Sequence, residues 1–244
     1  MSGALPTFVV IGAMKCGTTA LHHMLRGHPA IAMSDPKELN FFFGTAPPAP
    51  DADDRWAEGN WWRGVDWYAH HFPAHVPVRG ESSPGYTSPD HPEVAARLAD
   101  TLPAARLVYL VRDPIDRAVS QYHHHRRDGA EPRPLVEALL DPGSQYVARS
   151  RYSERLAPFL DHVPRQRILV VAMEDLRDER DATLTRVLSF LGAGAPQSCD
   201  AGRPATRRPA RLPRALHAQV ATMLRDDVTR LRDLTRHRFD RWSV

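Results

Sequence analysis

Phe8-Val9-Val10-Ile11-Gly12-Ala13-Met14-Lys15-Cys16-Gly17-Thr18-Thr19-Ala20-Leu21 is the stretch that decides the fold of this 244-residue chain. Its four leading apolar residues predict a short buried strand, and the apolar spacing of Leu21, Met24 and Leu25 predicts a helix over 18–26. A glycine-containing loop joins the two elements. The N–H groups of such a loop and the N-terminus of the helix face a common point, which favours the binding of an anion.

The loop departs from the common phosphate-binding pattern. Gly12 and Gly17 have the spacing of G-x-x-x-x-G-K-[ST], but Thr18 stands at the lysine position and Lys15 lies inside the loop. Only Lys15 and Lys37 are lysines; the other 30 of the 32 basic residues are arginines. A compact ammonium and a planar guanidinium are not interchangeable, so a lysine at position 15 indicates a specific demand rather than an ordinary turn. For Lys37, an ordinary surface position explains the lysine as well as a specific demand does.

Composition bounds the class of protein. The apolar share of 42% and the charged share of 25% are ordinary for a globular protein, and the length fits one α/β domain over 1–244. A net charge of +3 suits an anionic cofactor, and we expect no nucleic-acid partner. No apolar run reaches membrane-spanning length, and no basic region precedes the first apolar run as in a secretory signal. Cys16 and Cys199 form neither a disulfide framework nor a zinc site, so we expect a cytoplasmic protein without a bound metal.

Apolar runs and helical spacings alternate along the chain. This alternation predicts a P-loop-like three-layer α/β fold, with a central parallel sheet flanked by helices. Strands are expected over 8–11, 31–33, 76–80, 106–111 and 167–173. Helices are expected over 18–26, 66–72, 89–102, 114–125, 134–140, 150–163, 182–191 and 212–234. Residues 44–65 form an irregular insertion in this prediction, and 193–214 form a basic loop rich in proline and glycine.

A second stretch of interest is Asp35-Pro36-Lys37-Glu38-Leu39-Asn40-Phe41-Phe42-Phe43. Phenylalanines close to Glu38 can dehydrate its carboxylate and raise its pKa, as a general base requires. The alternative is a surface Lys37–Glu38 pair followed by core phenylalanines, and the residues alone leave both interpretations open. Trp61 and Trp62 in the insertion either contact an acceptor or anchor the loop to the core.

The predicted strand over 106–111 runs directly into Arg112-Asp113-Pro114. Asp113 suits a helix N-cap and Pro114 suits the first helical turn. Arg112 then lies at the carboxyl end of a strand, where open α/β sheets bind ligands. Ser120 follows two helical turns later, so both side chains can reach one phosphate. Three consecutive histidines at 123–125 end the predicted helix. We assign them to stabilisation of the helix C-terminus rather than to a metal site.

Four stretches in this order, 12–21, 37–42, 81–86 and 112–122, resemble the sulfotransferases that use 3′-phosphoadenosine 5′-phosphosulfate (PAPS). The resemblance is strongest to bacterial members, including enzymes of secondary metabolism, and to the heparan sulfate branch. It implies that the loop residues Lys15, Cys16, Gly17, Thr18 and Thr19 hold the 5′-phosphosulfate. It also implies that Lys15 stabilises the leaving oxygen, that Arg112 and Ser120 hold the 3′-phosphate, and that Glu38 is the base. Arg207 and Arg208 are candidates for a cofactor-closing loop by position only.

The acceptor side departs from the family pattern. Heparan-type enzymes carry a histidine where this chain has Asn40, and a lysine where it has Ser82. We place Lys37, Asn40, Ser82, Trp61 and Trp62 on the acceptor side. Other sulfotransferases use a histidine base, which keeps His70 and His71 as alternatives to Glu38.

The resemblance implies in-line transfer of a sulfuryl group to a hydroxyl or amine, leaving adenosine 3′,5′-bisphosphate (PAP), with no metal required. A small molecule, a carbohydrate or a lipid would serve as acceptor, and a homo-oligomer stays open. Two rival interpretations are an atypical P-loop small-molecule kinase and a non-catalytic nucleotide-binding relative. The kinase would need a lysine after the second glycine and a Mg²⁺-binding pair, and neither is evident in the sequence.

Overall fold

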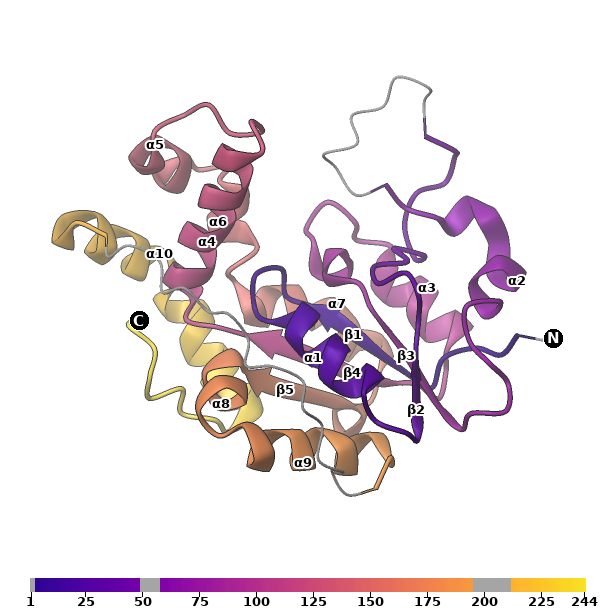
Figure 1. Cartoon of the computed structure of the whole chain (residues 1–244). Helices are drawn as coiled ribbons and strands as arrows, with labels where there is room; N and C mark the ends of the chain where they lie inside the picture. Colours follow the sequence, from indigo (N-terminus) through magenta and orange to yellow (C-terminus); the bar gives the residue numbers. More distant parts are fainter. Residues whose placement is uncertain (1–2, 49–57, 195–211) are drawn as a thin grey trace.

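Five parallel strands form one central sheet in the order β2-β3-β1-β4-β5 (Figure 1). The structure is a computed structural model that describes residues 3–48, 58–194 and 212–244. The strands are β1 (Phe8–Gly12), β2 (Ile31–Met33), β3 (Val78–Ser82), β4 (Arg106–Val111) and β5 (Ile168–Ala172). Because β1 lies between β3 and β4, its carboxyl end is flanked by theirs, which is where ligands bind to sheets of this type.

Helices cover both faces of the sheet. The elements are α1 (Thr18–Arg26), η1 (Trp61–Arg63), α2 (Gly64–Ala69), η2 (Pro84–Thr87), α3 (Val94–Thr101), α4 (Pro114–Arg127), α5 (Leu135–Leu140), α6 (Gln145–Ala148), α7 (Tyr152–His162), η3 (Arg165–Arg167), α8 (Met173–Asp178), α9 (Arg180–Leu191) and α10 (Arg214–Thr235). In the view of Figure 1, α1, α8 and α9 lie in front of the sheet, and α3 and α7 pack together behind it. The predicted three-layer α/β fold is confirmed.

Two apolar clusters hold these layers together. The larger one surrounds the sheet, where the side chains of β1 and of Leu107–Val111 in β4 are at most 1% exposed. The smaller one joins α4, α5 and α6 to the first half of α10. It fixes α4, whose N-terminus begins directly after the end of β4, relative to the sheet. Among the described residues, no helix combines the length and the apolar character needed to cross a membrane.

Several boundaries differ from the sequence prediction. Strand β3 occupies 78–82 rather than 76–80, because Gly80, Glu81 and Ser82 pair with Phe8, Val9 and Val10 of β1. Helix α4 continues to Arg127, beyond the predicted end at 125. Helix α3 begins at Val94 rather than at residue 89, after a turn in which Ser88 Oγ bonds Asp90.

The short helices α6 and α8 were not predicted, because a single turn leaves little periodicity to read. The predicted insertion over 44–65 contains η1 and the first residues of α2, so its last part is helical.

Candidate active site

The loop after β1 has the geometry of an anion cradle. Ala13 N donates to Leu110 O over 2.7 Å and thereby ties the loop to β4. Gly17, with φ of 88°, is the N-cap of α1, and no acidic residue lies in the first turn of this helix. The first N–H groups of a helix have no partner within it. In the described part of the chain, no backbone bond outside helices and strands uses the N–H of Gly17, Thr18 or Thr19.

Lys15 lies within this loop in a left-handed conformation, with φ of 70°. The side chain is half-buried, and burial lowers the pKa of its ammonium; the charges of Arg127 and Arg112 lower this pKa further. Left-handed backbone at a residue other than glycine costs about 1–3 kcal/mol and is common at functional sites. Lys15 therefore presents its ammonium in a strongly positive environment, where an anionic ligand would be stabilised.

The remaining loop residues differ in what they offer. Cys16 is fully buried, its Sγ lies 3.5 Å from Tyr152 OH, and burial raises its pKa to about 11. Its N–H donates to Ala13 O, so both its thiol and its N–H are occupied within the protein. Thr18 is 5% exposed, whereas Thr19 is exposed. The loop thus offers a ligand its backbone groups and the Lys15 ammonium rather than its cysteine.

Arg112 lies beside the loop at the carboxyl end of β4, as predicted. Its Nη1 is 3.5 Å from Lys15 O, and its Nη2 is 3.5 Å from Asp116 Oδ2. Ser120 follows Asp116 by four residues on α4, so it lies on the same helical face and is partly exposed. The structure therefore brings Arg112 next to Lys15 and places Ser120 further along the same side of α4.

The Glu38 carboxylate forms an ion pair with the Lys37 ammonium. The Glu38 side chain is 41% exposed, which favours the surface Lys37–Glu38 pair over a carboxylate dehydrated by the phenylalanines. Glu38 and Asn40 both have left-handed backbone, with φ of 65° and 47°. This double turn directs Phe41 and Phe42 into the core, where they pack against Tyr68. Asn40 is 7% exposed and its Oδ1 has no hydrogen-bond partner among the described residues.

Three further residues expected on the acceptor side contact other side chains of the protein. Ser82 is fully buried and its Oγ lies 3.2 Å from His22 Nδ1. Trp61 packs against Phe41 and lies under the Arg97 guanidinium. Trp62 is partly exposed, with the Arg63 guanidinium 4.4 Å from its ring centroid. Of these three, Trp61 and Trp62 are partly exposed, whereas Ser82 is not accessible to an acceptor.

Glu81 is a central residue that the sequence analysis missed. Its fully buried carboxylate accepts hydrogen bonds of 2.6 Å from Tyr68, Ser83 and Tyr86. Ser83 Oγ accepts from Asn40 N over 3.1 Å, and Tyr86 OH accepts from Phe41 N over 2.9 Å. The network therefore fixes the backbone that follows Glu38. The sequence signal that could have identified Glu81 was the presence of a carboxylate within an otherwise buried strand.

His124 on α4 is the second missed residue. Burial lowers the pKa of the His124 ring, and the charge of Lys15 lowers it further, whereas the charge of Glu38 raises it. Arg127 Nη2 lies 2.8 Å from His124 Nδ1, and Asp128 Oδ2 lies 3.0 Å from the same nitrogen. Arg127 can only donate, so Nδ1 accepts in that contact; in the other tautomer Nδ1 donates to Asp128 instead, and Nε2 is then the basic atom. The sequence signal for the position of His124 was its spacing of four residues from Ser120, which places both on one helical face.

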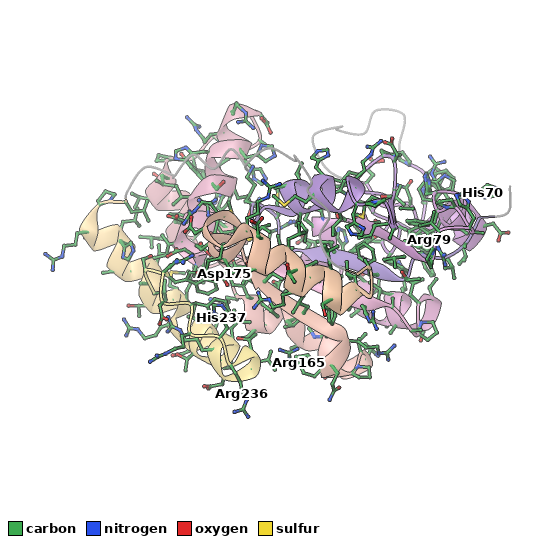
Figure 2. All side chains as sticks on the ribbon, turned by 60° about the horizontal axis from the view of Figure 1, so that its bottom comes forward. His70, Arg79, Arg165, Asp175, Arg236 and His237 are labelled. Carbon is green, nitrogen blue, oxygen red and sulfur yellow. The ribbon has the colours of Figure 1, made fainter. Side chains whose placement is uncertain are left out.

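The other candidates lie apart from the loop or outside the described residues. His70 is exposed at the end of α2, and Figure 2 shows it far from Asp175. His71 lies beside Trp67 on the same segment. Arg207 and Arg208 lie outside the described residues. Within the described ranges, no group of three or more His, Cys, Asp or Glu side chains is arranged to hold a metal.

Comparisons with known proteins agree with this geometry. The bifunctional heparan sulfate N-deacetylase/N-sulfotransferase 2 of Bos taurus is 30% identical over 211 residues, covering 77% of this chain and 22% of the relative. The membrane-associated sulfotransferase kil1 of Dictyostelium discoideum is 38% identical over 124 residues, covering 49% of this chain and 23% of the relative. The chain thus spans less than a quarter of the length of these curated relatives.

A sulfotransferase from Alicyclobacillus acidocaldarius has a solved structure that superposes with a TM-score of 0.80 at 26% identity, covering 99% of this chain and all of that one. The sulfotransferase domain of the Synechococcus PCC 7002 olefin synthase shares the fold at a TM-score of 0.55 and 18% identity. The family model described as "Sulfotransferase domain" matches residues 5–201. A match over most of the chain, together with these relatives, shows that the protein belongs to the sulfotransferase family.

Proposed function

We propose that this protein transfers a sulfuryl group from PAPS to a hydroxyl or amine of an acceptor. The observation that carries the proposal is the loop after β1. It combines N–H groups at the start of α1 that have no backbone partner among the described residues, a left-handed Lys15, and Arg112 in contact with the Lys15 carbonyl. These groups fit a ligand with more than one anionic group.

The residues present fit the two anionic ends of PAPS. The N–H groups of Gly17, Thr18 and Thr19 and the Lys15 ammonium would hold the 5′-phosphosulfate, because a helix N-terminus without an acidic residue attracts anions. Arg112 and Ser120 would hold the 3′-phosphate. Bound PAPS supplies the sulfuryl group. Arg207 and Arg208 keep their proposed role of closing over the cofactor.

The residues of the site have defined tasks in this proposal. Lys15 and the loop amides place positive charge where the leaving group becomes more negative, which lowers the barrier without a reorganisation cost. Glu38 accepts the proton of the acceptor group. Since Lys37 already occupies Glu38 Oε1, the acceptor must either use Oε2 or displace Lys37. His124 is the second candidate for the proton, because the charges of Lys15 and Glu38 both act on its ring.

A carbohydrate is the first acceptor class to test, since the names of several relatives specify heparan sulfate. The Arg127 and Arg112 side chains add positive charge beside Lys15, and this charge favours an acidic carbohydrate over a neutral one. A small-molecule or lipid acceptor belongs in the same panel.

Binding and turnover measurements test the proposal together. PAP should raise the melting temperature more than adenosine 5′-phosphate does, because a ligand that binds only the folded state stabilises it by mass action. Incubation with PAPS and an acceptor panel, followed by mass spectrometry, should show addition of a sulfuryl group. Equal stabilisation by both nucleotides would remove the assignment of Arg112 and Ser120. Turnover with ATP and Mg²⁺, but not with PAPS, would identify the kinase instead.

A further inference from the structure

The residues that follow α10 pack against the carboxyl ends of β4 and β5. We call residues 236–244 the C-terminal tail. Phe239 and Trp242 are 3% and 8% exposed, and their rings stack with centroids 4.1 Å apart. His237 Nε2 lies 2.9 Å from Asp175 Oδ2 on α8, and Figure 2 shows these two residues side by side. The tail is therefore a packed part of this end of the molecule.

Two tail residues bond the groups that hold the junction between β4 and α4. Ser243 N donates to Asp113 Oδ2 over 2.5 Å, and Trp242 Nε1 donates to Glu174 Oε2 over 3.2 Å. Asp113 is the N-cap of α4, and its Oδ1 accepts from the N–H groups of Ile115 and Asp116 over 3.0 Å. The tail thus completes the hydrogen bonding of the carboxylate that starts this helix.

The same contacts enclose the backbone of Arg112. Glu174 Oε1 accepts from Asp113 N over 2.9 Å. Tyr152 OH donates to Arg112 O over 2.8 Å and lies 3.3 Å from Arg112 N. The Tyr152 ring lies against Trp242, with centroids 5.8 Å apart. Both side chains that bond this stretch of backbone, those of Glu174 and Tyr152, are therefore in contact with the tail.

The Arg112 side chain is buried, but its hydrogen bonds within the protein are longer than those of its backbone. Both of its hydrogen bonds are 3.5 Å long, near the limit for such a contact. Its direction in the site is therefore set mainly by the position of its backbone. We propose that Trp242 and Ser243 are positioning residues, which set the discrimination of the site for a nucleotide 3′-phosphate by holding the Arg112–Asp113 backbone. This inference rests on the proposed use of PAPS.

Ser243→Pro tests the inference, because proline lacks the N–H that Asp113 accepts. The measurement is the ratio of the Kd for adenosine 5′-phosphate to the Kd for PAP, by calorimetry on the full chain. We expect this ratio to fall by at least about 5-fold in Ser243→Pro, the lower end of usual coupling between two sites. The matched control is Ser243→Ala, which keeps the N–H and should keep the ratio.

Trp242→Phe provides a second test if Ser243→Pro does not fold. It keeps a ring against Tyr152 and Phe239 and removes only the donor to Glu174, so the same ratio should fall. Because coupling is reciprocal, PAP should also slow hydrogen exchange of the tail amides more than adenosine 5′-phosphate does.

The outcomes separate the two proposals. A wild-type protein that binds PAP no better than adenosine 5′-phosphate would overturn the use of PAPS, and this inference with it. A wild-type protein that discriminates, with unchanged ratios in Ser243→Pro and Trp242→Phe, would overturn the role of the tail alone. Equally weakened binding of both nucleotides in the variants would show a general loosening of the site instead of positioning, and would also overturn the role of the tail.

Discussion

Substituting Glu81 with glutamine should destabilise the fold and disturb the turn at Glu38 together. The Glu81 carboxylate accepts three short hydroxyl bonds, two at Oε1 and one at Oε2, and it is fully buried. A glutamine side chain has one acceptor oxygen, and its NH₂ group cannot accept a bond. Glu81→Gln therefore leaves at least one buried hydroxyl without an acceptor.

The expected size follows from this count. A buried donor without a partner costs about 1–3 kcal/mol. Burial raises the pKa of Glu81, so the substitution also removes a buried charge, which offsets part of the loss. We expect the free energy of unfolding to fall by about 1–2 kcal/mol, out of a total of about 5–15 kcal/mol. The Ser83 and Tyr86 hydroxyls also anchor Asn40 and Phe41, so kcat/KM should fall as well.

Urea unfolding with an unchanged m value measures the first effect, and turnover measures the second. The control is Glu93→Gln, because Glu93 has only a partly exposed pair with Arg97 and should change stability by less than about 0.5 kcal/mol. The raised pKa of Glu81 means that the folded state takes up a proton before the unfolded state does. The difference in free energy of unfolding between wild type and Glu81→Gln should therefore widen as the pH falls from that raised pKa toward the ordinary value of 4.5. A variant as stable as wild type at neutral pH would refute the reasoning.

Three further predictions concern the loop and its surroundings. Lys15→Ala should lower kcat by about 10²-fold or more while weakening PAP less, and Lys15→Arg should not restore turnover; normal kcat in either variant contradicts the role. Glu38→Gln should lower kcat by about 10²–10⁴-fold and remove the acidic limb of the kcat/KM profile, whereas the same loss in His124→Ala with an active Glu38→Gln would make His124 the base. Burial, and then the charge of Lys37, lower the pKa of His22 to about 4, so the unfolded state binds its proton first. Stability measured by urea should therefore decline as the pH falls from about 6.5 to about 4, and His22→Gln should flatten this decline.

Much of the geometry around the loop and Arg112 could be predicted from the sequence because it depends on local order. A strand, a loop lysine and a helix follow one another over 8–26, and a strand ends at Arg112 directly before a capped helix. In each case the residues that define the geometry are neighbours in the chain. Parallel pairing of β1 with β4 then brings Lys15 and Arg112 together.

The acceptor side could not be predicted in the same way because its contacts join distant segments. Phe41 is close to Glu38 in number, but the left-handed turn directs the ring away from it. Ser82 is occupied by His22, 60 residues away, and the tail residue Ser243 bonds Asp113 across 130 residues. No periodicity or short motif records such pairings, although a carboxylate within a buried strand does mark Glu81 as a residue that needs partners.

The charges around the loop support the proposal that an anionic ligand binds there. Arg117 is fully buried and bonds only neutral groups among the described residues, namely Ser150 Oγ, Gln121 Oε1 and the Tyr146 carbonyl. A buried charge without a counter-charge is costly, and burial lowers the pKa of Arg117 accordingly. After burial, the charges of Arg127, Arg112 and Arg117 all lower the pKa of Lys15. The folded protein thus holds several cations close together at one end of its sheet, and a doubly anionic nucleotide would relieve their repulsion. Binding should in turn raise the pKa of Lys15, which keeps its ammonium charged where the leaving group needs it.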